Sequence, residues 1–153
     1  MIPIAWVMMV PACWAIASQI VMNTPYSQKH SATRQKGALV IISALAFVAW
    51  DLFLDPQMTS WRFWEWYYSP GGYFGIPWSN FGGWALSMGI ITALLLPEPT
   101  PQPSLILIYG LTWGLESIAL LFFWNLSGPA VCGFFGMGLF VYLAWHFRQR
   151  SVP

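Results

Sequence analysis

The chain has 153 residues, of which 58% are hydrophobic, 18% are aromatic and only 7% are charged. About a quarter of the residues are charged in ordinary soluble domains, so the composition excludes that class and indicates an integral membrane protein. A formal net charge of +1 provides no basic surface of the kind that attracts nucleic acid.

Five apolar runs are long enough, or nearly so, to cross a bilayer, which takes about 20 residues. In chain order they are 2–22, 37–54, 81–96, 105–126 and 130–147. No internal repeat is visible among them. We therefore predict one all-α transmembrane domain over residues 1–153, a polytopic bundle of about five helices.

The basic residues are unevenly distributed over this predicted topology. With five spans, only Arg62 falls on one side. The other five basic residues fall on the opposite side: Lys29, Arg34, Lys36, Arg148 and Arg150. By the positive-inside rule, the N-terminus is then outside and the C-terminus is cytoplasmic.

Two carboxyl groups, Asp51 and Asp55, come at the end of the second run. A spacing of four residues places both on one face of a helix. Pro56 disfavours helical geometry at Asp55, so we expect the helix to end there, with Asp51 one turn inside. Burial and a neighbouring carboxylate both disfavour ionisation. One acid of the two can then stay protonated, as general acid–base chemistry requires.

Structural roles stay open for these acids. Asp55, at a helix end, could simply pair with Arg62. Glu116 is a third catalytic candidate, because an unpaired charge in the middle of the fourth run is costly, but it could instead be a structural partner of a Trp or Ser on another helix. No Cys or His spacing suggests a metal site.

The acids are followed by the aromatic segment SWRFWEWYYSPGGYFGIPWSNFGGW. An aromatic belt at the membrane interface is one interpretation, but the rings surround the segment on nearly every side. Glycines and prolines between residues 70 and 77 favour a return that lets backbone approach a ligand closely. We predict a re-entrant or interfacial hairpin over 57–80 that lines a cavity. The candidate substrate-binding residues are Trp50, Trp61, Trp64, Trp66, Tyr73, Phe74, Trp78 and Asn80.

The stretch WDLFLDPQM, with GGYFGIPWSNFGGW and the later LIYGLTW, FFWNLSGPA and GFFGMG, resembles the membrane carotenoid-biosynthesis proteins of the CruF type. Those proteins are hydratases that add water across the terminal double bond of an acyclic carotenoid end group. The resemblance implies a carotenoid substrate, no cofactor, and a bacterial inner or photosynthetic membrane. Chains of that family usually extend further at the N-terminal side, so we expect residues 1–153 to be the C-terminal part of the family's domain.

The implied hydration suits two carboxyl groups. Protonating the alkene gives a tertiary carbocation, which water then captures. One acid would donate the proton, a role that depth assigns to Asp51, and the other would orient the water. Aromatic ring faces would stabilise the cation. Two other classes stay open: a non-catalytic carotenoid-binding or structural subunit of a larger complex, such as a photosynthetic reaction-centre and light-harvesting assembly, and a proton-linked transporter that uses Glu116.

Overall fold

The computed structural model describes residues 2–24, 31–67 and 71–149. Its helices are α1 (Ile2–Asn23), α3 (Ala32–Ser60), α4 (Trp78–Leu95), α5 (Pro103–Ile118) and α6 (Ser127–Gln149), and a π-helical turn, η1 (Ala119–Phe123), continues α5. Each predicted run corresponds to one of these helices. The predicted all-α class is confirmed, since the described residues contain no strand beyond an isolated bridge between Tyr73 and Ile76.

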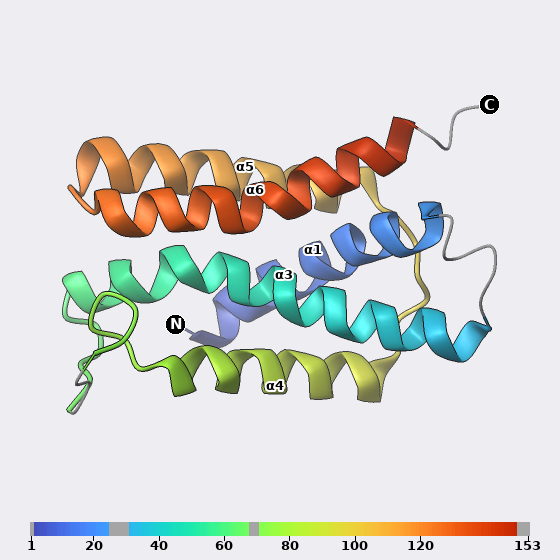
Figure 1. Cartoon of the computed structure of the whole chain (residues 1–153), viewed down its shortest axis with the longest axis horizontal. Coiled ribbons are helices and arrows are strands. Elements are labelled where there is room, and N and C mark those ends of the chain that lie inside the picture. Colours follow the sequence, from blue (N-terminus) through green and yellow to red (C-terminus); the bar gives the residue numbers. More distant parts are fainter. Residues whose placement is uncertain (1, 25–30, 68–70, 150–153) are drawn as a thin grey trace.

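The helices lie side by side along one long axis, with α3 in the middle of the bundle (Figure 1). Helix α3 packs against α1, α4 and α6, while α5 packs against α6 and α1. One end of the bundle carries the start of α3 and the end of α6. The other end carries the residues that connect α3 to α4 and the turn between η1 and α6.

Four helical segments are long and apolar enough to cross a membrane: α1, α3, α5 with η1, and α6. They indicate an integral membrane protein. Helix α4, one of the five predicted spans, is not among the four, because polar and small residues such as Ser79 and Asn80 occupy its first turns. The start of α3, with Arg34 and Lys36, lies at the same end as Arg148 of α6. Which side of the membrane this end faces stays a prediction.

The expectation that the second helix ends at Asp55 is wrong, because α3 continues to Ser60 with Pro56 inside it. A proline has no N–H, so the carbonyl group of Leu52, four residues earlier, loses its helical partner. The Tyr73 hydroxyl donates a hydrogen bond to that carbonyl oxygen at 3.0 Å. A contact from the connecting segment therefore replaces the missing helical bond. Within a membrane, a backbone carbonyl that lacks its helical partner needs a hydrogen bond from elsewhere in the protein.

Removing this hydroxyl should destabilise the end of α3. We expect Tyr73→Phe to lower the free energy of unfolding by about 1–3 kcal/mol, since it leaves the Leu52 carbonyl group unpaired. Pro56→Ala supplies an N–H for Leu52, so the loss should be smaller in the double variant. Thermal unfolding in detergent measures both, with Tyr67→Phe as the control because Tyr67 is exposed. An equal loss in both backgrounds would show that Tyr73 does not serve the Leu52 carbonyl.

Close contact between α3 and α6 depends on glycine. A Cβ atom at Gly133 would lie 2.5 Å from the ring of Phe53, and one at Gly136 would lie 2.8 Å from Leu52. Small residues allow helices to approach closely in lipid. By contrast, a Cβ atom at Gly110 of α5 would meet nothing within 4 Å.

This difference gives a matched pair of variants. Gly133→Ala should destabilise the bundle by about 1–3 kcal/mol, the usual cost of overpacking a closely packed site, because the Phe53 ring is fully buried. Gly110→Ala should have no such cost. Melting temperatures of the two variants in one detergent compare them directly, and equal values would contradict the packing described above.

Buried aromatic rings join α1, α3 and α4. The Trp6 ring lies 4.7 Å from that of Phe47 and 5.2 Å from that of Trp84, measured between centroids. Trp50 lies behind them, 5.4 Å from Phe47. This cluster fixes the position of Trp84, from which the polar contacts of the candidate site begin.

Candidate functional site

The acid pair, Asp51 and Asp55, lies on one face of α3. The two side chains are 0% and 1% exposed, and their carboxyl groups interact with each other. Among the described residues, no basic side chain forms an ion pair with either acid, and Arg62 lies exposed at the surface. The pair is therefore buried without a positive partner in the described part of the chain.

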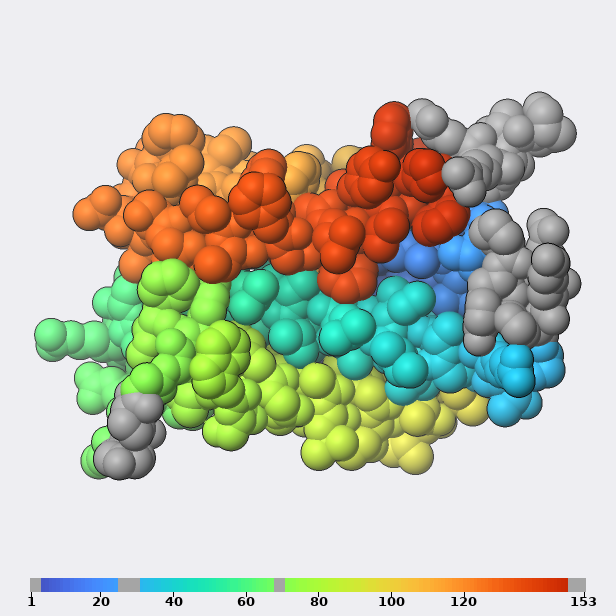
Figure 2. Space-filling view, in the orientation of Figure 1, coloured from blue at the N-terminus to red at the C-terminus, as the bar shows by residue number. Residues whose placement is uncertain are grey.

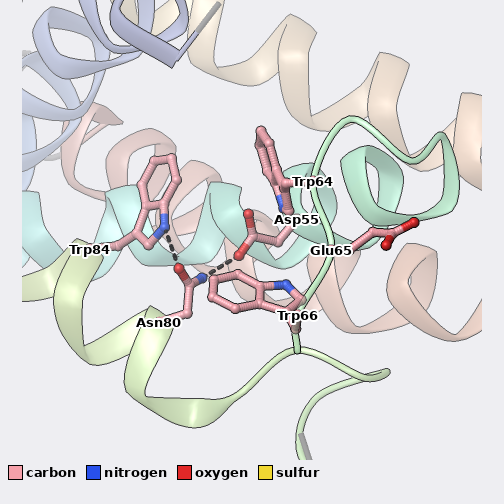
Figure 3. Close-up of a pocket in the computed structure, with 6 residues that line it drawn as sticks. All are labelled: Asp55, Trp64, Glu65, Trp66, Asn80 and Trp84. Carbon is pink, nitrogen blue, oxygen red and sulfur yellow. Dashed lines mark hydrogen bonds between the residues drawn. The ribbon is translucent and has the colours of Figure 1, made fainter. Parts of the chain in front are cut away.

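Asn80 of α4 bridges the two acids. Its Nδ2 donates to Asp51 Oδ2 at 3.2 Å and also to Asp55 Oδ2. Its Oδ1 accepts a hydrogen bond from Trp84 Nε1 at 3.0 Å. An indole N–H can only donate, so Trp84 sets the orientation of the amide and directs its NH₂ group to the carboxyl groups (Figure 3).

A cavity of about 260 Å³ opens beside the acid pair; we call it the aromatic cavity. Helix α3 contributes Asp55 to its wall, and α4 contributes Asn80 and Trp84. The segment after α3 contributes Trp64, Glu65 and Trp66 (Figure 3). The structure thus brings together Trp64, Trp66 and Asn80 from the predicted binding residues. Residues 57–60 of the predicted hairpin belong instead to α3, and residues 68–70 lie outside the described residues. Asp51 lies behind Asp55 and is not part of the wall.

The remaining predicted binding residues lie away from this wall: Trp50, Trp61, Tyr73, Phe74 and Trp78. Trp50 belongs to the buried cluster, and Trp61 packs edge-on against Trp124. Phe74 fills the space left by Gly128 of α6, and Figure 2 shows the segment before α4 against the start of α6. These side chains attach the connecting segment to the bundle.

Glu116 is also placed apart from the acid pair. Its Oε2 accepts a hydrogen bond from Gln57 Nε2 at 3.4 Å. Gln57 follows Asp55 by two residues, about 200° around a helix, so it points away from the aromatic cavity. We infer a structural role for Glu116, which satisfies a glutamine that is only 4% exposed.

Two residues of the cavity wall, Glu65 and Trp84, were missed in the sequence. The four-residue spacing of Asn80 and Trp84, which puts them on one face of α4, is a signal that could have identified Trp84. Glu65 has no comparable signal. Within the described residues, no group of three His, Cys, Asp or Glu side chains is arranged to hold a metal ion.

The fold and the site together define a class of protein: a polytopic helical membrane protein with a buried acid pair beside an aromatic cavity. The model of one family, described as carotenoid biosynthesis protein, matches residues 1–106. The chain therefore belongs to the carotenoid biosynthesis protein family. The match includes α1, α3 and α4, and with them every residue of the acid pair and the cavity wall. Comparisons with curated proteins and with solved structures gave no match.

Proposed function

We propose that this protein is a carotenoid hydratase of the CruF type, which adds water across the terminal double bond of an acyclic carotenoid end group. The family membership supports a role in carotenoid biosynthesis. The observation that carries the hydratase proposal is the acid pair, bridged by Asn80 and in contact with a cavity whose walls are mainly indole rings.

The acid pair is suited to hold one proton between its two carboxyl groups. Two ionised carboxylates side by side would repel each other, and burial strengthens that repulsion. Since no basic side chain among the described residues compensates them, the singly protonated pair is the favourable state, as in other carboxyl pairs used for acid–base chemistry. The Asn80 amide donates to both acids and so stabilises the remaining negative charge.

In the proposed reaction, Asp55 delivers the proton because it is the member of the acid pair that lies on the cavity wall. The alkene electron pair forms a C–H bond to this proton at the inner carbon, and the outer carbon becomes a tertiary carbocation. A water oxygen then bonds to that carbon, and one water proton returns to the acid pair. The products are a tertiary alcohol and a regenerated pair. The sequence predicts Asp51 as the direct proton donor, because it lies deeper in the helix. In the reaction proposed here, the two acids share the proton, and it leaves through Asp55.

The surroundings favour this chemistry. The indole rings of Trp64, Trp66 and Trp84 belong to the cavity wall, and aromatic rings can stabilise a carbocation electrostatically. A cavity of about 260 Å³ is small for a ligand pocket, so it would take the end group and leave the polyene in lipid. About 20 residues from Gly37 span the hydrocarbon core, which places the acid pair near its edge, within reach of water.

Expression in a bacterial host that accumulates acyclic carotenes tests the proposal. We expect new carotenoids heavier by one or two water molecules, detected by mass spectrometry of the extracted pigments. An unchanged pigment profile, with the protein confirmed in the membrane fraction, would contradict the hydratase. Carotene that copurifies with the protein, without any hydrated product, would favour the non-catalytic binding subunit instead.

A further inference from the structure

Two hydrogen-bond donors in the wall of the aromatic cavity have no partner among the described residues. The Nε1 atoms of Trp64 and Trp66 are both buried and make no hydrogen bond to the part of the chain that the structure describes. Buried polar groups are normally paired, and an unpaired one costs free energy. Such donors in a cavity wall indicate that something with an acceptor atom binds there.

The chemistry of the reactants identifies that molecule. An acyclic carotene end group is a hydrocarbon and offers no acceptor to an indole N–H. Water is the only polar reactant in the proposed hydration. A water molecule needs two to four polar partners to be held in a cavity, and the Trp64 N–H and the Asp55 carboxyl group, both in the cavity wall, supply a donor and an acceptor.

We propose that Trp64 Nε1 and Asp55 hold the water molecule that attacks the carbocation; this inference rests on the proposed function. In Figure 3 the indole nitrogen of Trp64 lies on the side of its ring that faces Asp55. The two groups are not directly hydrogen-bonded, and a water molecule can bridge polar groups that do not contact each other directly. The water accepts from the indole, donates to the carboxylate, and keeps one lone pair for the new C–O bond.

Deuterium separates the two steps of the reaction. In D₂O the acid pair transfers a deuteron to the inner alkene carbon. If water captures the cation, the alcohol carries that deuterium. If capture fails, the cation loses a proton from the same carbon, and the recovered carotene carries the deuterium instead. Label in recovered carotene therefore measures protonation alone, whereas alcohol measures protonation followed by capture.

The experiment uses the purified protein in liposomes with an acyclic carotene in D₂O. Trp64→Phe keeps a ring and removes the N–H. We expect about tenfold less alcohol, the effect of losing one hydrogen bond, with unchanged or increased deuterium in recovered carotene. Trp124→Phe serves as the control, because Trp124 lies at the same end of the bundle outside the cavity wall. If Trp64→Phe does not insert, benzothienylalanine at position 64 replaces the N–H by sulfur with little change of shape.

Two results would overturn the water site while the hydratase stands. If Trp64→Phe lowers the alcohol yield and the deuterium in recovered carotene by the same factor, Trp64 only shapes the cavity. If the alcohol yield of this variant is unchanged, the indole N–H is not needed. If the wild-type protein gives no alcohol and no deuterium in recovered carotene, the proposed function itself is overturned, and the water site with it.

Discussion

Asp55→Asn should reduce hydration of an acyclic carotene by about 10²–10⁴-fold, the usual contribution of a general acid. Asparagine has nearly the same shape but no carboxyl proton to give. Because Asp55 is the member of the acid pair on the cavity wall, the deuteron transfer to carbon should be lost together with the alcohol. The rate of alcohol formation and the deuterium in recovered carotene measure the two effects on one sample.

The control for this variant is Glu98→Gln, which removes an exposed carboxyl group from the linker between α4 and α5. It should hydrate like the wild type. Asp55→Asn should still insert and fold, since the change removes an acid whose burial is costly. Alcohol at near wild-type rates from Asp55→Asn would remove this residue from the mechanism.

Asp51→Asn should reduce the rate of hydration by a similar factor, for a different reason. Asp51 is fully buried behind Asp55, so it does not reach the substrate. Its negative charge keeps the shared proton on the pair. An amide at position 51 would instead donate a hydrogen bond to Asp55 and favour its ionised form, which has no proton to give. Hydration in liposomes over a range of pH measures this effect.

Acidic pH distinguishes the two variants. In Asp51→Asn the remaining acid, Asp55, can still be protonated at lower pH, so part of the hydration should return there. In Asp55→Asn, Glu65 is the remaining acid among the described residues of the cavity wall, and its carboxyl group points away from position 55 in Figure 3, so no recovery is expected. Equal behaviour of the two variants at every pH would contradict the separate roles given to the two acids.

The helices could be located from the sequence because apolar runs of about 20 residues are typical of membrane-spanning helices and rare elsewhere. The common face of Asp51 and Asp55 followed from their spacing. Both predictions depend on local pattern alone. Of the aromatic segment, Trp64 and Trp66 line a cavity, whereas four other predicted binding residues do not: Trp61, Tyr73, Phe74 and Trp78.

What the sequence did not show depends on contacts between distant residues. Helix α3 passes Pro56 because Tyr73, seventeen positions later, replaces the lost helical bond; a propensity rule for proline sees only the neighbouring residues. Likewise, the amide of Asn80 serves the acids only because α4 packs against α3. The separation of Glu116 from the acid pair also follows from helix packing, which a linear pattern does not contain.

The central claim is that the alcohol oxygen comes from water, added by protonation of the alkene. The most direct test incubates the purified protein with an acyclic carotene in H₂¹⁸O under argon. We predict that the alcohol forms without O₂ and carries one ¹⁸O atom at each hydrated end. An alcohol that requires O₂ and contains its oxygen, or the absence of any alcohol from protein that binds the carotene, would contradict the account.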